Sequence, residues 1–323
     1  MKEISFIRQN IAKWKNLETV VDSSSTQDPG RLADAYTEIT TDLSFSRSHY
    51  PRSRITIYLN NLASALHNAL YKNKKETSSR ILRFWTTEVP LVMYESRREL
   101  LYSFLVFILS AAIGCISTLN DELFPRLIMG NAYMDMTMRN IANGDPMGVY
   151  GHTSPLLMFF MITINNIQVS FVVFALGIFT GFGTGWALFR NGIMIGAFQT
   201  FFFQQNLGME SMLAVWLHGT LEISAIIIAG AAGFALGNGW LFPKTYSRGY
   251  AFRQGAKRGL KIVVGTTPVF IIAGFIESFL TRHTEMPNMI RGSFILLCAA
   301  FVIYYYIYLP KQVNDNAISK PQN

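Results

Sequence analysis

Two ionisable residues, His218 and Glu222, stand one helical turn apart in the otherwise uncharged run from Met212 to Phe234. An i, i+4 spacing places both side chains on one face of a helix. A charged group near the middle of a bilayer costs at least about 2.5 kcal/mol, so a chain that keeps one there provides it with a partner or a task. The pair is therefore expected inside the protein, either as a hydrogen-bonded packing pair or as a functional site.

A metal site at this pair is disfavoured, because a catalytic zinc needs three protein ligands and no second histidine occurs in an apolar run. His152 and His283 fall in segments expected to be external loops, and neither has a companion at ligand spacing. No nucleophile-elbow pattern points to serine-type hydrolysis. We therefore expect no metal, no cofactor and no enzymatic activity. An intramembrane hydrolase that uses the pair ranks last among the functions considered.

Polar residues of neighbouring apolar runs are candidates for the same layer. At 1.5 Å per residue, Glu222 lies roughly 15 Å from the outer end of its helix, and Asn165 and Asn166 lie about 14 to 18 Å from the end of theirs. Arg190 is roughly 20 Å deep on the same count, so we predict an ion pair between Arg190 and Glu222. Asn191 follows directly and is assigned to this intramembrane cluster. Glu277, one turn from the end of a later run, is expected at the rim.

The helix that carries the pair is expected to have two unlike faces. Small residues continue the face of His218 and Glu222: Ala225, Ala229, Ala232 and Gly233. Bulky residues gather opposite: Trp216, Ile223, Ile227 and Phe234. This pattern predicts a small, polar inner face packed against protein and a bulky outer face.

Glycines recur at helix-packing intervals around this helix: Gly177, Gly181, Gly185, Gly192, Gly196, Gly233 and Gly237. Small residues let helix backbones approach closely, so the spacing predicts close helix crossings. Local unwinding, as at transporter sites, is the alternative interpretation.

Six apolar runs are long enough to hold these residues within a membrane, since a spanning helix needs roughly 17 to 25 residues. The runs are Leu101–Leu119, Leu156–Thr180, Gly183–Phe203, Met212–Phe234, Leu260–Leu280 and Gly292–Leu309. Half of the residues, 50%, are hydrophobic and 15% are charged, against roughly 25% charged in soluble domains. The sequence predicts an all-α polytopic membrane protein, with a helical bundle over residues 101–310.

Loop charges predict the orientation. Residues 237–261 carry six Lys or Arg and no acid, as expected of a cytoplasmic loop, whereas residues 120–155 are acidic and suit the outside. Both termini are then cytoplasmic, including the tail 311–323. The run 183–203, weakened by Arg190 and glycines, must cross fully for this arrangement to hold; five crossings would place the basic loop outside. The net charge of +8 reflects this membrane pattern, and no nucleic-acid partner is expected.

The first hundred residues predict a small cytoplasmic helical domain. Asp28 and Pro29 form an N-cap and first-turn pair that opens one helix, and residues 52–71 have helical periodicity for a second. The two are expected to form an antiparallel hairpin. Residues 80–100 mix aromatic and arginine side chains, so they either lie along the inner membrane surface or extend the domain.

Several stretches resemble the stage II sporulation protein M family: Asn165-Asn166, Gly181-Phe-Gly183-Thr, Asn191-Gly192, His218-Gly219-Thr-Leu-Glu222, Ile228-Ala-Gly230-Ala-Ala-Gly233 and Ala273-Gly-Phe-Ile-Glu277. The N-terminal part resembles it too, from Trp14 through Tyr58-Leu59-Asn60 to Phe84-Trp85. This resemblance implies a polytopic protein of the bacterial inner membrane. The relatives that give the family its name are membrane scaffolds for enzymes that remodel septal peptidoglycan.

Three functions follow in order. The first is a scaffold that contacts membrane lipid and recruits envelope-remodelling proteins through the cytoplasmic domain and residues 120–155. The second is a transporter or channel in which the mid-membrane polar layer binds solute or protons. The third is the intramembrane enzyme. A homodimer formed through a glycine face is a further expectation.

Overall fold

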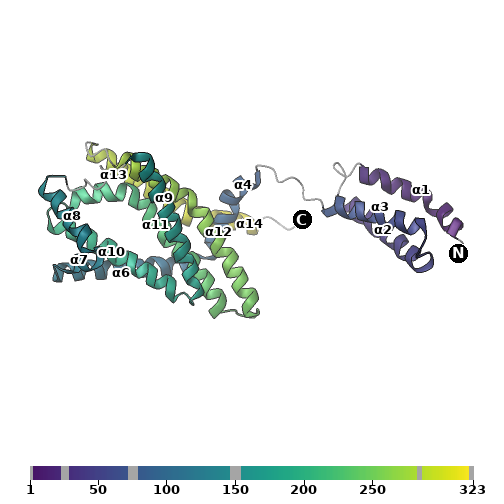
Figure 1. The fold of residues 1–323 in the computed structure, drawn as a ribbon, viewed down its shortest axis with the longest axis horizontal. Helices are drawn as coiled ribbons and strands as arrows, with labels where there is room; N and C mark the ends of the chain where they lie inside the picture. The colour runs from purple at the N-terminus through teal and green to yellow at the C-terminus, as the bar shows by residue number, and fades with distance from the viewer. Residues whose placement is uncertain (1–2, 23–28, 72–78, 146–153, 282–285, 320–323) are drawn as a thin grey trace. The chain divides into compact units, whose positions relative to one another are not determined.

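The computed structural model describes residues 3–22, 29–71, 79–145, 154–281 and 286–319, and helices are the regular elements throughout these ranges (Figure 1). The chain divides into two compact units, Met1–Ser79 and Arg80–Asn323. The predicted all-α fold is confirmed. The division falls earlier than position 100, where the sequence analysis ended the N-terminal domain.

The N-terminal unit is a bundle of α1 (Glu3–Asp22), α2 (Pro29–His49) and α3 (Arg54–Tyr71). The predicted hairpin corresponds to α2 and α3, and α1 packs against both. Asp28, the predicted N-cap, lies outside the described residues. Three side chains from the three helices, Trp14, Ile39 and Leu59, are fully buried, so this unit has its own hydrophobic core.

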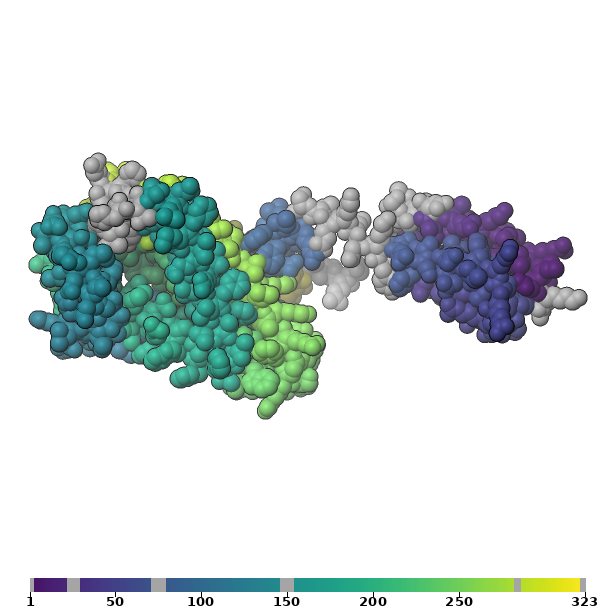
Figure 2. All heavy atoms as spheres, viewed as in Figure 1, coloured from purple at the N-terminus to yellow at the C-terminus, as the bar shows by residue number. Residues whose placement is uncertain are grey.

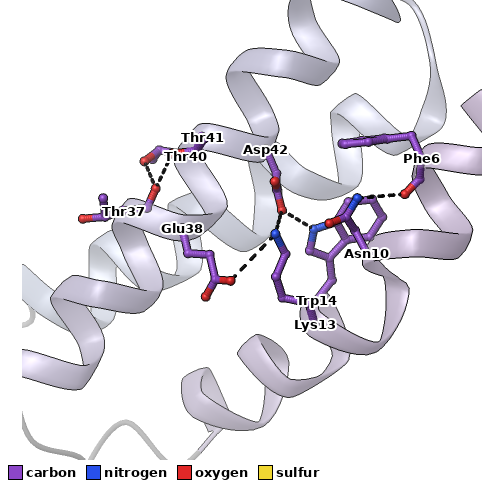
Figure 3. Close-up of polar contacts among 9 residues, drawn as sticks. All are labelled: Phe6, Asn10, Lys13, Trp14, Thr37, Glu38, Thr40, Thr41 and Asp42. Carbon is purple, nitrogen blue, oxygen red and sulfur yellow. Dashed lines mark hydrogen bonds and ion pairs between the residues drawn. The ribbon is translucent and has the colours of Figure 1, made fainter. Parts of the chain in front are cut away.

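Trp14 ties α1 to α2 by a polar contact as well as by packing (Figure 3). Its Nε1 donates to Oδ2 of Asp42 at 2.8 Å, and Nζ of Lys13 lies 2.6 Å from the same oxygen. A buried indole N–H needs such an acceptor. The carboxylate therefore satisfies the tryptophan and is itself partly neutralised by the lysine.

The second unit begins with three short segments, α4 (Ser79–Arg83), η1 (Phe84–Glu88) and α5 (Val89–Glu95). Long helices follow: α6 (Arg97–Asn120), α9 (Pro155–Ala175), α10 (Phe182–Gln204), α11 (Gly208–Leu241), α12 (Arg248–Phe275) and α13 (Asn288–Ile303). Shorter segments connect or extend them: α7 (Phe124–Met129), α8 (Asn131–Ala142), η3 (Leu176–Ile178), η4 (Ile276–Leu280), η5 (Tyr304–Tyr308) and α14 (Leu309–Ser319).

Five helical stretches among the described residues are long and apolar enough to cross a membrane: Arg97–Asn120, Pro155–Ile178, Gly208–Leu241, Arg248–Leu280 and Asn288–Ser319. They match five of the six predicted runs. The remaining run, Gly183–Phe203, forms α10, whose 23 residues would extend about 34 Å, but its composition does not meet the same requirement. The full crossing of α10 stays a prediction.

Helix α11 lies at the centre of this unit and contacts α6, α9, α10, α12 and α13. In its most apolar stretch 72% of the residues are buried, against 22% for α6. The predicted bulky outer face is wrong, because Ile223 and Ile227 are each only 8% exposed. Neighbouring helices surround α11 on every side, so side-chain size does not mark a face toward lipid.

Residues 80–100 pack onto the long helices of the second unit, which we call the membrane unit, through specific contacts. Nε1 of Trp85 donates to the carbonyl of Gly265 at 3.1 Å, and the Tyr305 hydroxyl donates to the carbonyl of Trp85 at 2.7 Å. Val89 is fully buried in the same core. These contacts to α12 and η5 explain why the boundary precedes residue 80.

The predicted loops and tail are more helical than expected. The basic segment 237–261 contains only a short connection, 242–247, between α11 and α12, and α14 continues to Ser319 beside α5. Residues 120–155 include α7 and α8, and Met134 of α8 packs against Phe201 and Phe202. Helices α7 and α8 lie at the opposite end of this unit from the α11–α12 connection (Figures 1 and 2).

Candidate functional site

His218 and Glu222 meet a third ionisable residue, Glu277. One nitrogen or oxygen from each of these three side chains lies within 4.8 Å of the others. Nε2 of His218 is 3.7 Å from Oε1 of Glu277, and the two side chains are only 5% and 14% exposed. We call His218, Glu222 and Glu277 the buried triad.

The imidazole of His218 is oriented by Thr281. Nδ1 of His218 lies 3.2 Å from Oγ1 of Thr281, and that hydroxyl donates to the carbonyl of Ile276 at 3.4 Å. In the tautomer with its proton on Nδ1, His218 donates to Thr281, which keeps its own proton for the carbonyl of Ile276. In that tautomer Nε2 presents a lone pair toward Glu277.

Glu277 is not a rim residue, and this correction has a structural cause. After Phe275 the last part of the fourth candidate span is the π-helical segment η4, which contains Glu277. A π-helical turn has more residues per turn than an α-helix, so it changes the direction of the side chains that follow. Segment η4 contacts both α9 and α11, and Glu277 faces His218.

The predicted ion pair between Arg190 and Glu222 is wrong. Arg190 is exposed on α10, and no ion pair joins it to Glu222. Its neighbours one turn before and after on α10, Trp186 and Met194, are also exposed, by 55% and 42%. The exposed stripe shows that this side of α10 faces away from the buried triad.

The other predicted polar residues line one cavity of about 490 Å³. Asn165 and Asn166 from α9, Asn191 from α10, and His218 and Glu222 from α11 all contribute to its wall. Met129 of α7 and Tyr133 of α8 line it as well. Burial raises the pKa of Tyr133, so its phenol stays protonated at neutral pH. The cavity therefore combines amide, hydroxyl, imidazole and carboxylate groups.

Asn166 is a buried amide beside Glu222 of the triad. Its side chain approaches the carboxylate of Glu222 and accepts a long bond of 3.4 Å from Asn165. Only 6% of Asn166 is exposed, and its Nδ2 is near Glu222 without forming a hydrogen bond of good geometry to any described residue. Since Nδ2 is the only donor of this side chain, the amide is the group that faces the carboxylate of Glu222.

The structure places most of the predicted packing glycines at backbone contacts. A Cβ at Gly177 would collide with the carbonyl of Gly233, and one at Gly237 would lie 2.6 Å from N of Gly181. Similar clashes with α6 would arise at Gly192 and Gly196.

Gly181 itself has φ +80°, a left-handed conformation that suits glycine, at the start of α10. Gly185 differs, because a Cβ there would make ordinary contact, 3.9 Å, with the ring of Phe234.

The sequence analysis disfavoured a metal because it found only two candidate ligands, His218 and Glu222, where three are needed. The buried triad provides three. Glu277 is the third group, and it comes from a different helix from His218 and Glu222. His152 and His283 lie outside the described residues. Thr281 was missed by the sequence analysis, because no local pattern connects it to His218.

Comparison with protein families finds two matches. A family model described as Stage II sporulation protein M matches residues 103–282, which include the buried triad and Thr281. A model described as a domain of unknown function (DUF8413) matches residues 4–72 of the N-terminal unit. Comparison with curated proteins and with solved structures gives no match.

Proposed function

Because the chain belongs to the stage II sporulation protein M family, whose model covers more than half of it, we propose that this multi-pass membrane protein is an assembly scaffold. It recruits proteins that remodel the peptidoglycan of the cell envelope. It resides in the bacterial cytoplasmic membrane with both termini in the cytoplasm.

The observation that carries this proposal is the division of the chain into two units with separate cores. The membrane unit has close backbone contacts around α11, such as Gly177 against Gly233, which favour a fixed platform over a mobile gate. The N-terminal unit is matched by its own family model and offers a second binding surface.

That second surface includes a groove between α2 and α3 with a volume of about 730 Å³. Its wall is mostly polar and includes Arg47, Asn60 and His67. Nη2 of Arg47 donates to Oδ1 of Asn60 at 2.6 Å, so the guanidinium is held at the surface by the neighbouring helix. An ordered cation at a polar groove favours an acidic or carbonyl-rich protein segment as partner.

Charge distribution supports the proposed orientation. The exposed basic residues Arg248, Arg253 and Lys257 occupy the first turns of α12 at one end of the unit. The exposed acidic residues Asp121, Glu122 and Asp135 lie near α7 and α8 at the opposite end. The positive-inside rule then assigns the α12 end to the cytoplasm.

Affinity capture of the full chain from membranes of its native cells tests the scaffold proposal. The exposed Met138 on α8 is changed to Glu in one variant, and the exposed Met289 on α13 serves as the matched control, Met289→Glu. Arg47→Glu tests the groove. We expect peptidoglycan-remodelling proteins to co-purify with the wild type and the control and to be depleted with Met138→Glu or Arg47→Glu. Capture of no envelope protein by the wild type would refute the proposal.

A transporter or channel is the second candidate, and the polar cavity of about 490 Å³ is the observation that favours it. Reconstituted vesicles that contain the full chain are loaded with a panel of ions and small polar solutes. Movement of one solute that is lost in Glu222→Ala and kept in Glu210→Ala, an exposed carboxylate on the same helix, would rank transport above scaffolding.

A further inference from the structure

We propose that His218, Glu222 and Glu277 bind one divalent transition-metal cation at the wall of the polar cavity. Zinc–ligand bonds of about 2.0 to 2.2 Å at tetrahedral angles place neighbouring ligand atoms roughly 3.3 to 3.6 Å apart. The distance between Nε2 of His218 and Oε1 of Glu277 is 3.7 Å, close to this separation. All three ligand atoms lie within 4.8 Å of one another, so small side-chain rotations bring them to one ion.

The negative charges of Glu222 and Glu277 favour a divalent cation at this site. Among the described residues, no Lys or Arg forms an ion pair with Glu222 or Glu277. Two carboxylates that are largely buried together repel each other, and burial without compensation is costly. One dication neutralises both and leaves the neutral imidazole as its third ligand.

Thr281 gives the histidine the surroundings of a metal ligand. Metal-binding histidines almost always donate their other ring N–H to an oxygen, which fixes the tautomer. Nδ1 of His218 makes such a contact with Oγ1 of Thr281 at 3.2 Å. The lone pair of Nε2 is thereby directed to the side where Glu277 lies.

The polar cavity beside the triad offers room for a further ligand of the cation. His218 and Glu222 line this cavity, whereas Nδ2 of Asn166 has no exposed surface and faces the carboxylate of Glu222. A metal with three protein ligands takes water or a substrate atom as its next ligand. The cavity of about 490 Å³ can hold that water or substrate atom.

The donor set selects among cations. One imidazole nitrogen with two carboxylates suits Zn²⁺ and other first-row transition metals, whereas Mg²⁺ and Ca²⁺ favour sites made of oxygen ligands alone. Zn²⁺ alone is therefore the probe, and Mg²⁺ is the comparison ion.

Metal binding to the full chain in detergent, after stripping with a chelator, tests this proposal. We expect one Zn²⁺ per chain after equilibrium dialysis, a raised Tm with Zn²⁺ and no such effect of Mg²⁺ at the same concentration. X-ray absorption at the zinc edge is expected to show a nitrogen and oxygen shell near about 2.0 Å.

Variants locate the site. Glu222→Gln and Glu277→Gln keep the side-chain shape and are each expected to weaken Zn²⁺ binding by more than about tenfold, since even loss of an outer-shell contact costs 10- to 100-fold. Thr281→Val, which removes only the orienting hydroxyl, is expected to weaken it about 10- to 100-fold. Glu210→Gln is the matched control, because its exposed carboxylate lies on the same helix as Glu222, and binding should be unchanged.

Two results would overturn the proposal. One is a wild-type chain that takes up no stoichiometric Zn²⁺. The other is unchanged Zn²⁺ affinity in both Glu222→Gln and Glu277→Gln. If one glutamine variant does not fold, the other variant and the wild-type stoichiometry still decide. The outcome is independent of the scaffold proposal, because partner capture is measured separately.

Discussion

Oε1 of Glu277 lies 3.7 Å from Nε2 of His218, although the whole of α12 separates the two residues along the chain. This contact joins the fourth candidate span to the third at their buried polar residues. It turns a local His-Glu pair into a site with three ionisable groups. The proposed cation site depends on it, and the predictions below address the packing that surrounds it.

Because Gly177 is in close backbone contact with Gly233, we expect that even a methyl side chain at position 177 destabilises the protein. Gly177→Ala would place Cβ against the backbone of Gly233, forcing η3 away from α11. We expect a loss of about 1 to 3 kcal/mol in stability, typical of overpacking, measured as a lower unfolding temperature in detergent. Gly185→Ala is the matched control, because its Cβ meets Phe234 only at 3.9 Å. Equal losses in both variants would contradict this prediction.

We expect little energetic coupling between Arg190 and Glu222, because Arg190 is exposed and forms no ion pair with Glu222. Arg190→Gln should change stability by no more than about 0.5 kcal/mol. In a double-mutant cycle with Glu222→Gln the two effects should add within about 0.5 kcal/mol. Measured coupling well above that value would restore the ion pair that the structure excludes.

In the N-terminal unit, Trp14→Phe should cost more stability than Lys13→Met. The indole donates to Asp42 across two helices, and removal of a hydrogen bond to a charged group costs about 1.5 to 3 kcal/mol. The lysine is partly exposed, and a surface ion pair contributes about 0 to 1 kcal/mol. Hydrogen exchange of α1 and α2 peptides in the full chain measures both. Faster exchange in Lys13→Met than in Trp14→Phe would reverse the expected order.

We expect the N-terminal unit to lose stability at alkaline pH when the hydroxyl of Tyr58 ionises. Burial, followed by the hydrogen bond and the charge of Glu18, raises the pKa of Tyr58 from 10.0 to about 12. A raised folded-state pKa gives stability that is complete below pH 10 and is lost as the pH rises toward 12.

The tyrosinate absorbance of the wild type minus that of Tyr58→Phe should therefore titrate with a midpoint near 12. The same subtraction with the exposed Tyr246→Phe provides the control, because Tyr246 is 61% exposed. A Tyr58 midpoint near 10 would show that neither burial nor Glu18 affects it in solution.

Periodicity predicted the helices well, because runs of apolar residues near the length of a bilayer have few other structures open to them. Each predicted run from Leu101 onward lies in helical segments, although α11, α12 and the last stretch extend well beyond the predicted ends. The alignment of Asn165, Asn166, Asn191, His218 and Glu222 at one cavity also follows from counting residues along straight helices.

Glu277 and Arg190 show where such counting fails. The rim prediction for Glu277 rests on its distance from the end of its run, and that distance does not show that the π-helical segment η4 turns the side chain toward His218. Depth alone could not give the direction of Arg190, because depth does not say which way α10 is rotated about its axis. Both errors concern orientation, which packing between helices decides.

Helix α11 has neighbours on every side, and two of them, α12 and α13, follow it in the chain. During biosynthesis His218 and Glu222 leave the ribosome before Glu277 and Thr281 have been translated, so for an interval these polar side chains lack part of their final surroundings. An insertion factor that holds nascent helices together would shelter them over this interval. Truncated nascent chains that end before residue 248 should therefore be degraded faster than the full-length product.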